Sequence, residues 1–272
     1  MALQVTTLFL LSIAANFDRV AILCHKKGCD GMFDRWPKYF RNRVQLFDGA
    51  RIDPMFTKYI GKPRKNEKRP HSFFVTMAHV HVANTLFADN KTSSYLFLEE
   101  DYEVVSSGRS LNESASNIAR FVEKDRSWNF LRLGYNPTWQ AEPQDSICKD
   151  ACLCQTVHDG ICSITAGNFS KNSTCWIRST VGYAVHRRAW PALQELGNCT
   201  LDEINPGIDN WLPGFSNNCT NKSPVHYLIP GVLYQKSSKR RRKIFHVKAM
   251  EDFASKCATS DEYSFPTNTT GM

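Results

Sequence analysis

Residues 95–101 read Tyr-Leu-Phe-Leu-Glu-Glu-Asp, an apolar run that ends directly in three carboxylates. The apolar part is typical of a buried strand. Alternate residues of an extended chain face the same side, so we expect Glu99 and Asp101 to converge and Glu100 to point away. Hard divalent cations take oxygen ligands, and two such carboxylates can hold Mg²⁺ or Mn²⁺. The alternative interpretation is a solvated acidic turn.

Segments of strand type and of helix type alternate on both sides of this run. Short apolar runs predict strands at residues 19–23, 44–47, 128–133, 180–185 and 227–234. Apolar residues at helical spacing predict helices at residues 72–88, 111–122 and 187–196, and a capping box at Ser110 opens the second of them. The alternation predicts an α/β fold in which a mostly parallel central sheet is covered by helices on both faces. Ligands bind such sheets at the carboxyl ends of the strands.

The cysteines are concentrated in one part of the chain. Of the 10 Cys, half lie in a segment that is also rich in Gly, Asp and Asn: Cys148, Cys152, Cys154, Cys162 and Cys175. This pattern favours a disulfide-stapled insert loop at residues 142–175, formed in an oxidising compartment. The alternative is a zinc site made by these cysteines with His158, although their spacing fits no common zinc pattern.

Acceptor sequences for N-linked glycans, Asn-x-Ser/Thr, are more frequent than the roughly two or three expected by chance from the composition. They lie at Asn90, Asn112, Asn168, Asn172, Asn198, Asn218, Asn221 and Asn268. The sequence at Asn221 is the weakest acceptor, because Pro224 follows it. These sequences predict a protein of the secretory pathway, in the ER or Golgi lumen or secreted.

Residues 1–15 are interpreted as a candidate signal peptide, because Leu8–Ala15 is apolar and ends in small residues. The segment lacks the Lys or Arg of a typical signal peptide, and its alternative interpretation is a first core strand. No apolar run is long enough for a transmembrane helix. The globular domain is expected to span residues 16–245, followed by a C-terminal tail at residues 246–272.

The formal net charge of +8 suits an anionic ligand such as a nucleotide or a phosphate. Much of the excess positive charge comes from Lys62–Arg69 and Lys239–Lys243, which are equally well explained as solvated loops. The second cluster has three interpretations: a solvated tail, a processing site for a basic-specific protease, or a clamp for a diphosphate. Nucleic-acid binding would rest on these runs alone, and nuclear localisation conflicts with the glycan acceptors, so we expect no nucleic-acid partner.

Several short motifs follow one another in a characteristic order: Asp34-Arg35, Phe47-Asp48-Gly49, Ala78-His79, Leu98–Asp101, Leu131–Gly134, Thr180–Arg188, Ile208-Asp209 and Pro230–Gln235. In this order and spacing they resemble glycosyltransferase family 25, which includes lipooligosaccharide and procollagen galactosyltransferases. The resemblance covers about Arg19 to Lys243. The chain departs from the family pattern in the Cys-rich insert, in Glu100, where the family has Asp, and in Ala78, where it has Ser.

The resemblance implies a GT-A-like fold and a metal-dependent hexosyltransferase. It implies a nucleotide-sugar donor, UDP-galactose or UDP-glucose, with Mn²⁺ or Mg²⁺ as the metal, and inversion at the anomeric carbon. The acceptor would be a protein or a glycan. A non-catalytic secreted protein that binds carbohydrate or another partner on the same fold is the alternative.

The same resemblance assigns roles to individual residues. Glu99 and Asp101 are the expected metal ligands. Asp209 is the expected catalytic base, with a helix N-cap as its alternative role. His79, Arg35 and Gln235 are the expected donor-binding residues; the alternative for His79 is a core histidine, because Ala78, Val80 and Val82 surround it in the sequence.

Overall fold

The computed structural model describes residues 2–24, 29, 31–56, 70–104, 111–125, 127–139, 155–158, 160–164, 175–199, 208–212, 221, 223, 225–228 and 231–235. Its helices are α1 (Ala2–Ala14), α2 (Gly49–Phe56), α3 (Pro70–Phe87), α4 (Leu111–Lys124), α5 (Trp190–Gly197) and α6 (Ile208–Trp211), with 3₁₀ turns η1 (Phe33–Arg35), η2 (Lys38–Arg43) and η4 (Arg187–Ala189). Its strands are β1 (Arg19–Cys24), β2 (Val44–Asp48), β3 (Ser94–Glu99), β4 (Tyr102–Val104), β5 (Phe130–Trp139), β6 (Gln155–His158), β7 (Ile161–Ile164), β8 (Cys175–His186), β9 (Val225–Leu228) and β10 (Leu233–Gln235).

The strands form one sheet in the order β2-β1-β3-β8-β5-β9-β7-β6, and β10 pairs with β4 and β5 beside this path. β1 runs parallel to β2 and β3, and β5 runs parallel to β9 and β10. β8 lies between β3 and β5 and is antiparallel to both. The central sheet is therefore mostly parallel, as the sequence predicts.

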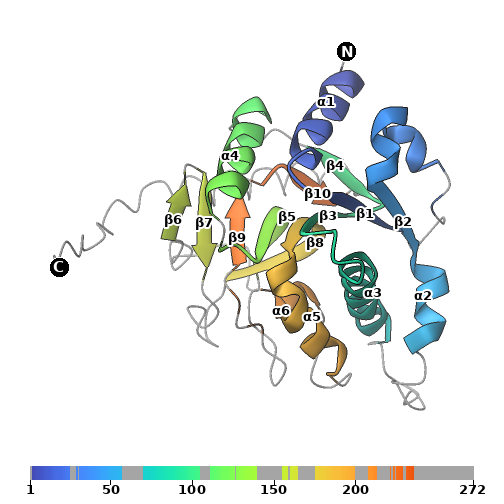
Figure 1. Cartoon of the computed structure of the whole chain (residues 1–272). Coiled ribbons are helices and arrows are strands. Elements are labelled where there is room, and N and C mark those ends of the chain that lie inside the picture. Colours follow the sequence, from blue (N-terminus) through green and yellow to red (C-terminus); the bar gives the residue numbers. More distant parts are fainter. Residues whose placement is uncertain are drawn as a thin grey trace, which may run out of the picture.

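Helices cover both faces of the sheet (Figure 1), with α1 and α4 on one face and α3, α5 and α6 on the other. The period of two along β3 divides its side chains between the two cores. Leu96 and Leu98 pack in the core beneath α1 and α4, while Tyr95 and Phe97 pack in the core beneath α3. Burial on both faces explains why the sequence of this strand is continuously apolar rather than alternating.

Several predicted elements differ from those in the structure. The strand predicted at residues 128–133 begins at Phe130 and continues to Trp139 as β5. Residues 227–234, predicted as one strand, form two strands, β9 and β10, which pair with different neighbours. The sequence between them contains Pro230, whose nitrogen lacks the N–H that a continuing ladder requires. Part of the predicted Cys-rich insert loop is also a strand pair: β6 and β7 are antiparallel, and β7 joins the sheet along β9.

Residues 2–14, the core of the candidate signal peptide, form the helix α1, so the alternative of a first core strand is wrong. The helix packs against α4, and its side chains Phe9, Ile13 and Ala14 are buried in the core of that face. Within the described residues, no helix has the length and apolarity to cross a membrane. The interpretation as a signal peptide stays untested, and the burial of these side chains points instead to a segment that is retained in the folded chain.

The cysteines whose side chains are described are all in disulfides. Cys24 is bonded to Cys29, and Cys162 and Cys199 are each disulfide-bonded as well. Cys162 is therefore excluded as a thiolate ligand, which removes one of the proposed ligands from the zinc alternative. The cysteines at 148, 152 and 154 lie outside the described residues.

The described glycan acceptor sequences divide by exposure. Asn90, Asn112 and Asn198 are exposed. Asn221 is buried, and its side-chain nitrogen donates hydrogen bonds to the carbonyl oxygens of Leu212 and Ser223. A glycan on that nitrogen would replace these bonds, so the fold excludes the acceptor that the sequence marks as weakest.

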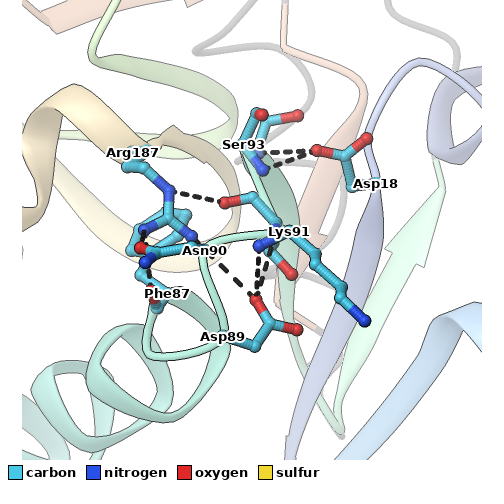
Figure 2. Close-up of polar contacts among 9 residues, drawn as sticks. Asp18, Phe87, Asp89, Asn90, Lys91, Ser93 and Arg187 are labelled. Atoms are coloured by element: carbon cyan, nitrogen blue, oxygen red, sulfur yellow. Dashed lines mark hydrogen bonds and ion pairs between the residues drawn. The ribbon is translucent and has the colours of Figure 1, made fainter.

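The amino end of β3 is fixed by a network of polar contacts (Figure 2). Arg187 donates hydrogen bonds to the carbonyl oxygens of Thr92, at 2.8 Å, and Phe87, at 2.7 Å, and to Oδ1 of Asn90, at 3.0 Å. Asp18 accepts hydrogen bonds from the backbone N–H groups of Ser93, at 2.7 Å, and Ser94, at 3.1 Å. These contacts tie the loop between α3 and β3 to the residue that directly follows β8 and to the residue that directly precedes β1.

We predict that α1 contributes to the stability of the folded protein. The side chain of Ile13 is fully buried, so Ile13→Ala should lower the free energy of unfolding by about 2–5 kcal/mol. Leu8 on the same helix is 66% exposed, and Leu8→Ala should change the free energy of unfolding by less than about 0.5 kcal/mol. Urea denaturation of the oxidised protein measures both. Equal stability of the two variants, or a mature protein that lacks these residues by intact mass, would contradict the prediction.

Candidate functional site

Three neighbouring parallel strands end side by side at one edge of the sheet. In their registers Leu23 of β1 lies opposite Glu99 of β3, and Cys24 lies opposite Asp48 of β2. The backbone N–H of Glu100 donates to the carbonyl oxygen of Leu23 at 2.9 Å, which continues the pairing one residue beyond β3. Acidic side chains therefore follow the buried part of β3 and of β2 at the edge where such sheets bind ligands.

The three carboxylates do not continue the strand as predicted. β3 ends at Glu99, and Glu100 and Asp101 form the turn that leads into β4. The two-residue alternation of an extended chain therefore applies to Glu99 but not to Asp101, and this premise of the sequence argument is wrong. All three residues are half-buried, so their exposure does not distinguish Glu100 from Glu99 and Asp101. The choice of Glu99 and Asp101 as metal ligands stays a prediction.

Glu99 is held by a side chain from the neighbouring antiparallel strand. The hydroxyl of Thr180 on β8 donates a hydrogen bond to Oε1 of Glu99 at 2.7 Å. Thr180 is nearly fully buried, at 4% exposure, and lies two residues before Gly182, which is opposite Leu98 of β3. The carboxylate thus has a defined orientation at the end of β3.

Arg35 and Gln235, two of the expected donor-binding residues, come from distant parts of the chain to the vicinity of Tyr102. The guanidinium carbon of Arg35 lies 6.0 Å from the centroid of the Tyr102 ring. Burial raises the pKa of Tyr102 above its usual range, and the charge and hydrogen bond of Arg35 act in the opposite direction. Gln235 of β10 is opposite Tyr102 in the β4–β10 pair, although its side chain is outside the described part. Tyr102 directly follows Asp101, so these positions adjoin the acidic turn.

The path of β10 toward β4 depends on a close approach that only glycine allows. A Cβ at Gly134 would lie 2.7 Å from the Cβ and the carbonyl oxygen of Leu233 and from Cγ1 of Val181. Contacts this short with a backbone oxygen would displace the strand. Gly134, the end of the Leu-Gly motif, therefore lets β10 cross beside β5 and reach the acidic turn.

His79 lies in the core rather than at the edge of the sheet. It is fully buried, and its ring stacks on Phe97, with ring centroids 4.2 Å apart. Its Nδ1 is joined to the hydroxyl of Tyr183 on β8 by a hydrogen bond of 2.6 Å. This is the environment of a core histidine, which is the alternative role. The buried ring is not accessible to a nucleotide-sugar donor. Two motif residues, His79 and Tyr183, are thus bound to each other and link α3 to β8.

Asp209 belongs to the short helix α6. This helix begins at Ile208, so Asp209 lies within its first turn. The alternative role of Asp209 as the N-cap residue of the helix is therefore wrong. The helix packs against α3 and β8, and the backbone N–H of Ile208 donates to Oγ1 of Thr76 on α3 at 2.9 Å. The side chain of Asp209 lies outside what is described, so its role as a base stays a prediction.

The oxygen atoms at the acidic turn suit a hard divalent cation. Glu99 and Asp101 are partly accessible to solvent, and both offer carboxylate oxygens. Among the described residues, no group of three or more His, Cys, Asp or Glu could hold a metal by itself. A metal bound here would therefore complete its shell with water or with ligand oxygens, as is common for Mg²⁺ with phosphates. The basic runs Lys62–Arg69 and Lys239–Lys243 are outside the described residues.

The sequence argument did not identify Thr180 and Tyr102 as site residues. Thr180 begins one of the motifs, but nothing in the sequence indicates that it contacts Glu99. Tyr102 could have been noticed because it directly follows the three carboxylates.

No protein-family model and no curated protein matches the chain. Among solved structures, it is similar to a glycosyltransferase involved in the glycosylation of the major capsid of PBCV-1. The TM-score is 0.34 and the sequence identity 11%, over 86% of this chain and 98% of that chain. A similarity this distant carries no argument about the fold or the function of this chain.

Proposed function

We propose that the chain is a metal-dependent, inverting glycosyltransferase with a GT-A-like fold, related to glycosyltransferase family 25. It transfers galactose or glucose from a UDP-sugar to a protein or glycan acceptor in the lumen of the secretory pathway. One observation carries the proposal: the acidic turn Glu99–Asp101 follows a central strand of a mostly parallel sheet, at its carboxyl end, with Glu99 oriented by Thr180. The order of the motifs along the chain supports it independently.

In this proposal Glu99 and Asp101 bind Mn²⁺ or Mg²⁺ through carboxylate oxygens. The metal, when bound, neutralises negative charge on the diphosphate of the leaving group. Arg35 adds a guanidinium next to Tyr102, beside the acidic turn, where it can pair with phosphate oxygens. Gln235, opposite Tyr102 in the β4–β10 pair, is proposed to donate a hydrogen bond to the nucleotide-sugar.

Asp209 is the proposed general base. Inversion requires one displacement, in which an acceptor hydroxyl oxygen bonds to the anomeric carbon while the bond from that carbon to UDP breaks. The hydroxyl proton passes to a carboxylate oxygen of Asp209. Support comes from the match of Ile208-Asp209 to the family motif and from α6, which packs on β8, the strand that also carries Thr180.

The function is tested by a donor screen with purified, oxidised protein. UDP release from UDP-galactose, UDP-glucose and other UDP-sugars is measured with Mn²⁺, with Mg²⁺ and with EDTA. Metal-dependent release from one or two donors is the expected result. If no donor is hydrolysed or transferred under any condition, the alternative of a non-catalytic binding protein replaces the proposal.

We predict that the three carboxylates of the acidic turn contribute unequally to metal-dependent activity. Asp101→Asn should abolish it and Glu99→Gln should weaken it severely, because each removes an anionic oxygen that the cation prefers. Glu100→Gln is the matched control from the same turn and should be mild. The measurement is the rate of UDP release against Mn²⁺ concentration. A Glu100→Gln variant as damaged as Asp101→Asn would show that the ligand assignment is wrong.

We also predict that Asp209 acts on the acceptor side of the reaction. Asp209→Asn should lower kcat about 10²-fold or more, because it removes the base, while donor affinity changes little. Steady-state kinetics give kcat, and calorimetry with UDP and Mn²⁺ gives donor-site affinity. If UDP binding is lost instead, Asp209 belongs to the donor site and another base must be found.

A further inference from the structure

The hydrogen bond between Thr180 and Glu99 joins two residues that are 81 positions apart in the sequence. Its length, 2.7 Å, is that of a strong hydroxyl–carboxylate hydrogen bond. Thr180 is 4% exposed, so its hydroxyl is largely shielded from water. The contact is therefore formed from the interior side of the sheet.

The position of Thr180 is itself fixed from several directions. β8 lies between β3 and β5 and pairs with both. Tyr183, three residues along, is tied to His79 of α3 by the 2.6 Å hydrogen bond. The β-branched side chain of threonine has few rotamers in a strand, so the hydroxyl keeps one direction. Thr180 is thus held rigidly in β8, and its hydroxyl points at the carboxylate of Glu99, the last residue of β3.

A carboxylate that accepts a hydrogen bond at one oxygen loses rotational freedom at both. With Oε1 of Glu99 bound to Thr180, the direction of Oε2 is set by the protein rather than by the cation. Carboxylates that bind metals are commonly hydrogen-bonded in this way, and loss of the outer partner typically costs about 10–100-fold in metal affinity or activity.

We propose that Thr180 is a positioning residue that orients Glu99 for the divalent cation. This inference rests on the proposed function, because it assumes that Glu99 is a metal ligand. It adds a residue from the antiparallel strand β8 to a metal site whose predicted ligands, Glu99 and Asp101, lie at the end of β3 and in the turn that follows it. It also gives His79 and Tyr183 a supporting role, since they hold β8 against α3.

The test compares Thr180→Val, which keeps the shape and removes the hydroxyl, with Thr180→Ser, which keeps the hydroxyl. Mn²⁺ affinity is measured by electron paramagnetic resonance of the free ion, titrated against protein in the presence of UDP. Thr180→Val should weaken Mn²⁺ binding about 10–100-fold and raise the Mn²⁺ concentration needed for half-maximal activity by a similar factor. Thr180→Ser should stay within about threefold of the unaltered protein.

A second comparison separates positioning from general destabilisation. In a Glu99→Gln background, Thr180→Val should weaken Mn²⁺ binding no further, because coupled residues are not additive. Thermal melting of each variant identifies any loss of fold, and Thr180→Ala replaces Thr180→Val if the latter does not fold. Unchanged Mn²⁺ affinity in a folded Thr180→Val or Thr180→Ala variant would overturn the inference and leave the proposed function standing. If the unaltered protein binds no Mn²⁺ with UDP, the metal-dependent function fails and the inference fails with it.

Discussion

β3 lies in the interior of the sheet and is covered by helices on both faces, and the architecture of the site depends on this constraint. The buried length of such a strand carries no unpaired charge, because an unpaired buried charge is too costly. The first carboxylate can appear only where the chain leaves the covered region, and in this protein that is Glu99. Because β1 and β2 run parallel to β3, their ends lie at the same edge. Burial thus concentrates the acidic residues at the place where a parallel sheet is open to ligands.

The two ends of β3 use polar residues for different purposes. At the amino end, Asp18 and Arg187 bind backbone groups of the α3–β3 loop, and these hydrogen bonds hold the loop in place. At the carboxyl end, Glu99 and Asp101 are only half-buried, and one oxygen of Glu99 is bound to Thr180. The carboxylates at this end are partly accessible to solvent, whereas Oδ2 of Asp18 at the other end accepts hydrogen bonds from two backbone N–H groups.

The antiparallel strand β8 connects the helix α3 to the site. One of its residues, Thr180, holds Glu99, and another, Tyr183, holds His79 in the core beneath α3. Gly134 on the neighbouring β5 lets β10 approach closely enough to reach β4 beside the acidic turn. A strand of opposite direction within a mostly parallel sheet thus supplies the contact that holds Glu99.

The sequence by itself determined the features that depend on local pattern. The apolar run of β3, the alternation of strands and helices and the disulfide-bonded state of the described cysteines all follow from composition and spacing. The turn at Glu100 was not predictable, because β4 forms only by pairing with β10, over a hundred residues later in the chain. The burial of His79 and the contact between Thr180 and Glu99 were likewise decided by the tertiary structure. Their partners lie 104 and 81 residues away, and only strand register and helix packing bring them within hydrogen-bonding distance.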